Sequence, residues 1–398
     1  MTSLFMRFNT QFQICVIYDE KRTKNLKEFF KDSNEINNCL KKVEDEYRPN
    51  SAANYLYNLI LKEHIDNKYI NIKNRCYEEY FIELIWATLD AWNMNSRSAK
   101  LADINDFKTN LINNIEAIES LKKYSIEDLS EKNDKSKGIF EQLKTLFNKL
   151  ELTNTDTKLV TFSKTMHFLL PNLIVPIDRT YTEKFFKLNF NNPKYEEFDH
   201  FTNIESAFGL FASEVNLDDF VRKNSKWCKY KTKIIDNIII GYVKIEQNNI
   251  FEFWSKFNTV LEEKNFPFKM RKAKNYQWYQ VELGTTQYAI NIELVNSDHR
   301  KRSDHKIRVN VNIQKNNDLY DFFFEHKSEI ESKLGYELTW DRKDDKSSSI
   351  CTYIDGLDYD NKSNYQNLIE QIITKTCKIR DVFSDLIQSY KNNEVEPK

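Results

Sequence analysis

The sequence predicts an all-α N-terminal domain followed by an α+β C-terminal domain in which helices pack an antiparallel sheet. From about residue 24 to residue 242, apolar residues recur at steps of three and four, which is the helical period. Beyond residue 249 the pattern changes to alternation with period two, which is typical of strands. The chain has only six glycines in 398 residues, the first at Gly138, so it has no glycine cluster of the kind that lets a backbone approach phosphate. A nucleotide-binding α/β enzyme is therefore disfavoured.

The helical period divides the first part of the chain into separate segments. Asp103 precedes an amphipathic stretch, which predicts a helix capped by that carboxylate. We expect helices at 77–92, 104–121, 139–150, 159–169, 180–187, 205–215 and 230–244.

The C-terminal part begins, after a polar break at 247–249, with a predicted helix at 251–264. Three alternating strands are expected at 275–283, 287–294 and 305–314, followed by a helix at 319–334 that Gly335 ends. Two more strands, at about 339–340 and 347–354, and a last helix at 365–390 complete the domain. In the third strand Ile307 and Val309 share one face and Arg308 and Asn310 the other, so half of the sheet faces solvent or a partner.

These patterns predict four parts. They are an N-terminal arm (1–20), a helical domain (21–246), an α+β domain (250–390) and a short tail (391–398). The six cysteines and six histidines are dispersed, which predicts reduced thiols, no bound metal and no cofactor. No apolar run of about 18 residues and no signal-peptide pattern is present, so we expect a cytoplasmic protein that does not bind membranes.

The most constrained stretch is 158–186, where Pro171 and Pro176 flank an apolar connection between two predicted helices. Lys164 and His167 lie three residues apart and so share a face of the first helix. Asp178 precedes the second helix, where free amide groups and the helix dipole stabilise a carboxylate. The plain interpretation of Asp178 is an N-cap, and the functional one is an acidic group facing Lys164.

This stretch resembles the segment of helix-hairpin-helix DNA glycosylases in which a Lys-Thr pair opens one helix and a Pro-Val-Asp-Thr-type motif follows. Here Lys164-Thr165 and Pro176-Ile177-Asp178-Arg179 stand in those places. The resemblance implies that Lys164 is an amine nucleophile and that Asp178 acts at the sugar C1′. His167, on the same helix face as Lys164, is the third candidate catalytic residue. The resemblance also implies that a flipped base stacks on Phe162, Phe168 or Tyr181. The hairpin glycines are absent, which favours a retained fold over a retained reaction.

Residues 251–383 resemble an uncharacterised bacterial family, number 4268 among the domains of unknown function. The resemblance is strongest at an Ile-Glu-x-x-Leu-Gly-x-x-Leu-x-Trp signature that begins at Ile330 and ends at Trp340. Members tend to occur with nuclease or restriction modules, so the resemblance implies a role in genome defence, with a partner protein from such a system.

Between Lys264 and Lys315, eleven lysines and arginines face four acidic residues. Aromatic residues interleave with them, and cations for phosphates together with rings for bases are typical of nucleic-acid contact. A polar loop that joins two predicted helices (92–101) adds two more basic residues. The candidate DNA- or RNA-binding residues are Lys269, Arg271, Lys272, Lys274, Arg300, Lys301, Arg302, Trp278, Arg97 and Lys100.

The sequence therefore predicts a bacterial nucleic-acid-interacting protein in genome defence or modified-DNA recognition, with a glycosylase-like helical domain. Two alternatives stay open. One is a non-enzymatic adaptor that binds proteins through both domains. The other is a metal-dependent nuclease in which Asp341 and Lys343 meet Glu293 from a neighbouring strand.

Overall fold

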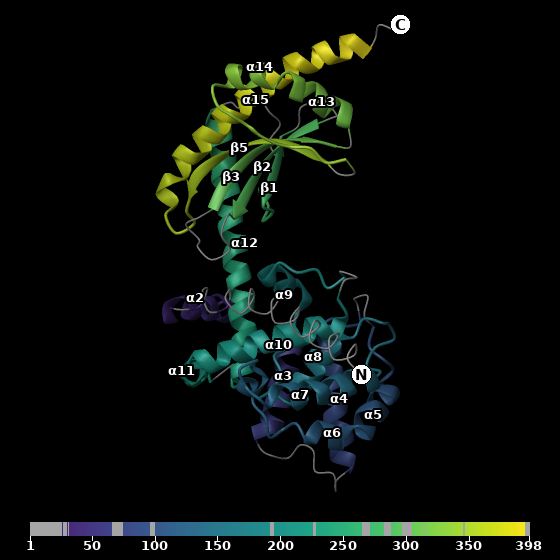
Figure 1. Ribbon diagram of the computed structural model, residues 1–398. Coiled ribbons are helices and arrows are strands. Elements are labelled where there is room, and N and C mark those ends of the chain that lie inside the picture. The colour runs from purple at the N-terminus through teal and green to yellow at the C-terminus, as the bar shows by residue number, and fades with distance from the viewer. Residues whose placement is uncertain are drawn as a thin grey trace. The chain divides into compact units, whose positions relative to one another are not determined.

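The chain divides into two compact units, Met1–Ile245 (unit 1) and Glu246–Lys398 (unit 2). The computed structural model describes residues 26, 30, 32–65, 75–95, 100–191, 195–225, 228–264, 271–281, 288–296, 305–314, 316–344 and 347–394. The predicted N-terminal arm lies outside them. Figure 1 shows helices throughout unit 1 and one twisted sheet with helices in unit 2. The fold class predicted from the sequence is confirmed.

Unit 1 is built from helices around one apolar core. Its elements are α2 (Ser33–Glu44), α3 (Ala52–Ile65), α4 (Arg75–Ala91), α5 (Ile104–Asn113), α6 (Ile115–Glu119), η1 (Ile126–Leu129), α7 (Ser136–Lys149), α8 (Leu159–Leu169), α9 (Arg179–Phe186), α10 (Glu197–Glu214), α11 (Leu217–Lys223) and the first part of α12 (Lys231–Glu263). Asp103 caps α5 as predicted, because its Oδ1 accepts a hydrogen bond from the Asn105 amide at 2.9 Å.

Two glycines of unit 1 sit where helices approach closely. A Cβ on Gly241 of α12 would lie 2.1 Å from the Cys39 carbonyl oxygen of α2. A Cβ on Gly209 of α10 would lie 2.6 Å from the Ser130 amide, just after η1. These contacts allow no larger residue at either crossing.

Unit 2 contains a five-stranded antiparallel sheet of order β1-β2-β3-β5-β4. Its elements are β1 (Trp278–Val281), β2 (Tyr288–Asn296), β3 (His305–Ile313), α13 (Asn317–Glu325), α14 (Lys327–Leu334), β4 (Thr339–Asp341), β5 (Ser348–Leu357), η2 (Lys362–Asn364) and α15 (Tyr365–Glu394). The apolar face of the sheet shares one core with α12, α13, α14 and α15. The long α15, yellow in Figure 1, runs along the sheet.

Several element bounds differ from the sequence prediction. The predicted helix 104–121 is two helices, and so is 319–334. The predicted break at 247–249 does not exist, because α12 is continuous from Lys231 to Glu263. The predicted tail is partly helical, since α15 extends to Glu394.

Among the described residues, no helix has the length and apolar character needed to cross a membrane.

Candidate functional sites

The connection from α8 to α9 is held on both sides by buried side chains. The Ile177 amide donates to Ser163 Oγ at 3.1 Å, and the Val175 amide donates to Glu205 Oε2 at 3.2 Å. Glu205 is fully buried on α10, and burial raises the pKa of its carboxyl group well above the usual value. Burial therefore favours the neutral form of this carboxyl group in the folded protein. The geometry of 170–177 is fixed from α8 and α10.

This connection places Asp178 beside Lys164. Asp178 caps α9, because its Oδ1 accepts from the Thr180 amide at 3.0 Å and from the Tyr181 amide at 3.5 Å. Its other oxygen, Oδ2, lies 3.5 Å from the Lys164 Nζ. The Lys164 side chain is 6% exposed and that of Asp178 is 20% exposed. The two interpretations of Asp178 are thus compatible, since one carboxylate caps the helix and pairs with the lysine.

A second lysine–aspartate pair, Lys233 and Asp236 of α12, lies in the same region at an Nζ–Oδ2 distance of 2.5 Å. The Nζ atoms of Lys164 and Lys233 lie 5.3 Å and 5.6 Å from the centre of the same Trp92 ring. Burial raises the pKa of Asp236 and the charge of Asp178 raises it further, while Lys233 and Lys164 oppose the shift. We call Lys164, Asp178, Lys233, Asp236 and Trp92 the charged centre.

His167 does not join the charged centre as an available acid or base. Its Nδ1 donates to the Ile174 carbonyl at 2.8 Å, and its Nε2 lies 3.0 Å from the Tyr57 hydroxyl. The Ile174 carbonyl can only accept, so Nδ1 carries the hydrogen and neutral Nε2 accepts from Tyr57. Burial lowers the pKa of His167 to about 3, so the imidazole stays neutral at physiological pH. In this geometry His167 has a structural role, and its predicted catalytic role stays a prediction.

The aromatic residues proposed to stack on a base have different positions. Phe162 and Phe168 are buried in the core of unit 1, where Phe162 packs on Phe147 and Phe201. Tyr181 is partly buried against the same core. Trp92 is the ring that faces Lys164.

The basic hairpin of unit 2 is described only in part. Lys269, Arg300, Lys301 and Arg302 lie outside the described residues, as does Arg97 in unit 1. Lys100 is exposed, and its carbonyl accepts from the Asn154 amide at 2.8 Å.

The described basic residues lead into β1. Lys272 and Lys274 are exposed, whereas Arg271 is half-buried and its amide donates to the Tyr279 hydroxyl at 2.7 Å. Tyr276 and Trp278 are about half exposed, and their rings stack at 6.1 Å with an angle of 20°. The Lys274 Nζ lies 5.4 Å from the centre of the Tyr276 ring.

The two faces of the sheet differ, as the alternation predicts. The register pairs Trp278 with Glu293, Glu293 with Arg308, and Arg308 with Tyr353, so these side chains share a face. We call this the open face. The Arg308 Nε donates to Glu293 Oε2 at 2.8 Å, and the Asn310 side-chain amide donates to Glu293 Oε1 at 3.1 Å.

The nuclease alternative loses its proposed metal site in this geometry. Glu293 lies on β2 and Asp341 on β4, with β3 and β5 between them. Three strand spacings amount to about 14 Å, whereas ligands of a hard cation lie about 2.0–2.6 Å from it. Lys343 pairs with Asp341 itself at 2.9 Å. Among the residues that the structure describes, no three His, Cys, Asp or Glu side chains group as metal ligands.

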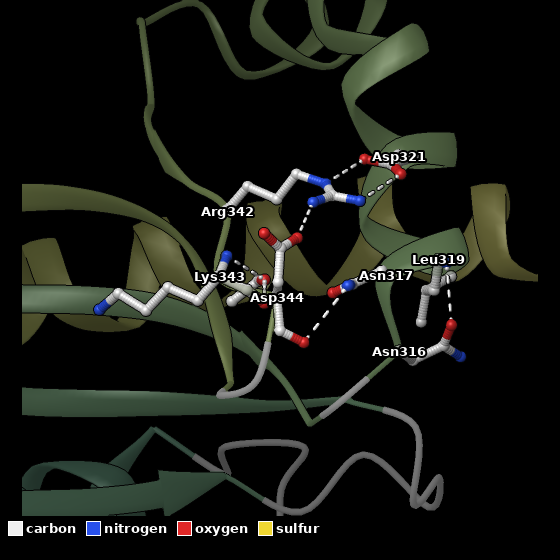
Figure 2. Close-up of polar contacts among 8 residues, drawn as sticks. Asn316, Asn317, Leu319, Asp321, Arg342, Lys343 and Asp344 are labelled. Atoms are coloured by element: carbon white, nitrogen blue, oxygen red, sulfur yellow. Dashed lines mark hydrogen bonds and ion pairs between the residues drawn. The ribbon is translucent and has the colours of Figure 1, made fainter.

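The loop after β4 instead ties the sheet to α13. Figure 2 shows Arg342 reaching Asp321 of α13 through two hydrogen bonds, at 2.8 Å and 3.0 Å, and Asp344 through another. The Asn317 side-chain amide donates to the Asp344 carbonyl at 3.5 Å. The Asp-Arg-Lys stretch therefore has a structural explanation.

The Ile-Glu-x-x-Leu-Gly-x-x-Leu-x-Trp signature also folds as a structural unit. Glu331 Oε1 accepts from the Leu338 amide at 2.9 Å and from the Trp340 indole at 3.0 Å. Burial acts to raise the pKa of Glu331, but these two hydrogen bonds outweigh it and hold the pKa below its usual value. Gly335 ends α14 with φ of +79°, a conformation that other residues rarely adopt.

Residues 251–387 match a family model described as Domain of unknown function (DUF4268). The matched range contains the sheet, the signature and most of α15, all of which lie in unit 2. No curated protein and no solved structure matches the chain. The comparisons give no support to the glycosylase resemblance of residues 158–186, which stays a prediction.

Sequence reasoning missed Trp92, Lys233 and Asp236 as members of the charged centre. The spacing of Lys233 and Asp236 on a helix could have indicated their ion pair. Their approach to Lys164 depends on how α12 packs on α8 and the end of α4, which no local pattern encodes.

Proposed function

We propose that this protein binds nucleic acid through unit 2, in the setting of genome defence or modified-DNA recognition that the family resemblance implies. The observation that carries the proposal is the exposed Tyr276–Trp278 stack beside Lys272 and Lys274. Exposed rings offer stacking surfaces for bases, and neighbouring ammonium groups attract phosphates.

The test is binding of a labelled oligonucleotide by fluorescence anisotropy between 50 and 200 mM salt. We expect the affinity to fall with salt, and the double variant Lys272→Ala/Lys274→Ala to bind more weakly with a shallower dependence. Each lost phosphate contact lowers the slope of log K against log salt by about 0.7–0.9. The matched control is Lys144→Ala/Lys149→Ala, which removes the same charge from α7. Affinity that does not change with salt, or equal loss in both double variants, contradicts the proposal.

A second proposed function belongs to unit 1, where the charged centre would carry out base-directed chemistry of the glycosylase type. The observation that favours it is the 3.5 Å contact of Lys164 Nζ with Asp178 Oδ2, because the resemblance requires these two groups to meet. The ion pair and the Trp92 ring both favour the charged ammonium. An amine nucleophile therefore requires that substrate binding separate Lys164 from Asp178.

This second function is tested by incubating the protein with ordinary and base-modified DNA, with and without Mg²⁺. The second function is supported if the parent protein produces abasic sites and the Lys164→Met and Asp178→Asn variants do not. Asp103→Asn is the matched control, since Asp103 also caps a helix and has no ion pair among the described residues. Strand breaks that require Mg²⁺ would support the nuclease hypothesis instead. Binding of DNA without any product would contradict base-directed chemistry.

A further inference from the structure

The open face carries aromatic rings at both ends of one cross-strand row. Trp278 of β1 is 47% exposed, and Tyr353 of β5 is 39% exposed. Between them lie Glu293 and Arg308, paired with each other across β2 and β3. Both rings emerge on the face that the core helices do not use, since the opposite residues of the same strands form the apolar core. The sheet thus holds both rings on the same face.

Side chains that can both donate and accept hydrogen bonds surround this row. The register places Gln280 and Asn291 on the open face, in a second row beside the first. Asn310 of the same row is buried and is already hydrogen-bonded to Glu293 and Ser349. Amide groups of this kind pair with the edges of bases, each of which presents donors and acceptors. The Arg308–Glu293 pair adds no net charge to the centre of the face. Exposed positive charge lies beside β1, at Lys272 and Lys274.

The width of the sheet decides which form of nucleic acid fits. Five strands span about 19 Å, and the major groove of B-DNA is about 12 Å wide. The groove admits a helix or a two-stranded ribbon, so this face is too wide for the major groove of a duplex. A ring on the open face stacks most readily on a base that is unpaired.

We propose that the open face binds single-stranded nucleic acid. Bases stack on Trp278 and Tyr353, the amide side chains of the neighbouring row contact base edges, and Lys272 and Lys274 contact phosphates at the edge of the sheet. This inference rests on the proposed nucleic-acid binding by unit 2 and specifies its substrate and its surface.

The experiment compares a mixed-sequence single strand with the duplex of the same sequence, in DNA and in RNA, using the full chain. We expect the single strand to bind at least about tenfold tighter. Tyr353→Ala should weaken single-strand binding by about 5- to 150-fold, which is the usual effect of losing one base–ring stack. Tyr353→Phe keeps the ring and should retain the affinity. Tyr80→Ala, which removes a ring that is 51% exposed on α4, is the control for losing an exposed aromatic residue.

The outcomes separate the two levels of the proposal. If the duplex binds as well as the single strand, or if Tyr353→Ala binds normally while Trp278→Ala does not, unit 2 binds nucleic acid and the open-face inference is wrong. If neither form binds, the proposed function fails and the inference fails with it. Circular dichroism at the assay temperature checks that the variants are folded, and Tyr353→Leu gives a second measurement if the alanine variant unfolds.

Discussion

Glu205 shows how one buried residue fixes a connection and makes stability depend on pH. Its Oε2 holds the Val175 amide, while its Oε1 has no hydrogen-bond partner among the described residues. Burial raises its pKa, so the folded state keeps the carboxyl proton above the pH at which the unfolded chain releases it. The stability that this group contributes is present below about pH 4.5 and is lost as the pH rises toward its folded pKa.

Glu205→Gln should therefore make unit 1 more stable than the parent protein at pH 7, because glutamine accepts from Val175 without taking up a proton. At pH 4 the variant and the parent protein should unfold at nearly the same denaturant concentration, because Glu205 is protonated in both states. The measurement is urea unfolding at both pH values. If the variant and the parent protein differ in stability by the same amount at pH 4 and pH 7, proton uptake by Glu205 is not the cause.

Asp178 differs from an ordinary N-cap through the lysine that it faces. Asparagine caps helices about as well as aspartate, so Asp178→Asn preserves α9 but leaves the buried Lys164 ammonium without this carboxylate. We expect a loss of about 1–3 kcal/mol, reduced from the cost of a fully buried pair because Asp178 is 20% exposed.

Asp103→Asn at the start of α5 makes the same chemical change without the buried lysine, and should alter the unfolding free energy by only a few tenths of a kcal/mol. The two variants are compared by urea unfolding at pH 7. Equal effects would mean that Asp178 acts only as a cap.

At the scale of elements, replacing a glycine by alanine should destabilise the protein at a helix crossing and stabilise it at a solvent-exposed position of a helix. Gly241→Ala would place a methyl carbon 2.1 Å from the Cys39 carbonyl oxygen, which forces α2 and α12 apart. We expect a loss of at least about 2 kcal/mol. Gly138 of α7 has no atom within 4 Å of its added Cβ, so Gly138→Ala should gain up to about 1 kcal/mol from helix propensity. Thermal unfolding of both variants checks the prediction, and a stable Gly241→Ala protein would show that the crossing is looser.

The signature of unit 2 is a folding element whose loss can be measured. Glu331 joins the end of α14 to β4 by accepting from the Leu338 amide and the Trp340 indole. Glu331→Ala leaves both donors without this acceptor and should destabilise unit 2 by about 2 kcal/mol. Glu331→Gln retains an acceptor and should lose about half as much. Chemical unfolding followed by tryptophan fluorescence distinguishes these effects. If the unfolding midpoint of Glu331→Ala equals that of the parent protein, the hydrogen bonds of Glu331 do not stabilise the fold of unit 2.

The elements also show what the sequence could predict. The alternation in β3 predicted which residues face the core and which face away from it. With a period of two, an apolar set on one face leaves the remaining residues on the other face. The predicted break at 247–249 was wrong because Gln247, Asn248 and Asn249 contain neither glycine nor proline, and polarity alone does not end a helix. The contact of Lys164 with Asp178 follows from the short connection between their helices. The approach of Lys233 depends on long-range packing of α12, which the local pattern could not specify.

At the scale of the whole molecule, the two units have separate cores, and one helix, α12, contributes residues to both. Phe107 is fully buried in the core of unit 1, and Phe323 is fully buried in the core of unit 2. Neither residue lies on α12. Phe→Leu at either position removes a similar volume and should cost about 1–2 kcal/mol. Because each core stabilises its own unit, we expect each substitution to lower the stability of one unit alone.

Hydrogen exchange measured by mass spectrometry tests this expectation segment by segment. Phe107→Leu should speed exchange in α4, α5 and α8 and leave β2, β3 and β5 unchanged, and Phe323→Leu should do the reverse. Calorimetry of the parent protein should show two transitions, each shifted by only one of the variants. A single transition that both variants shift equally would mean that the continuous helix α12 couples the two cores into one cooperative unit. In that case, nucleic-acid binding at unit 2 should also slow exchange around the charged centre of unit 1.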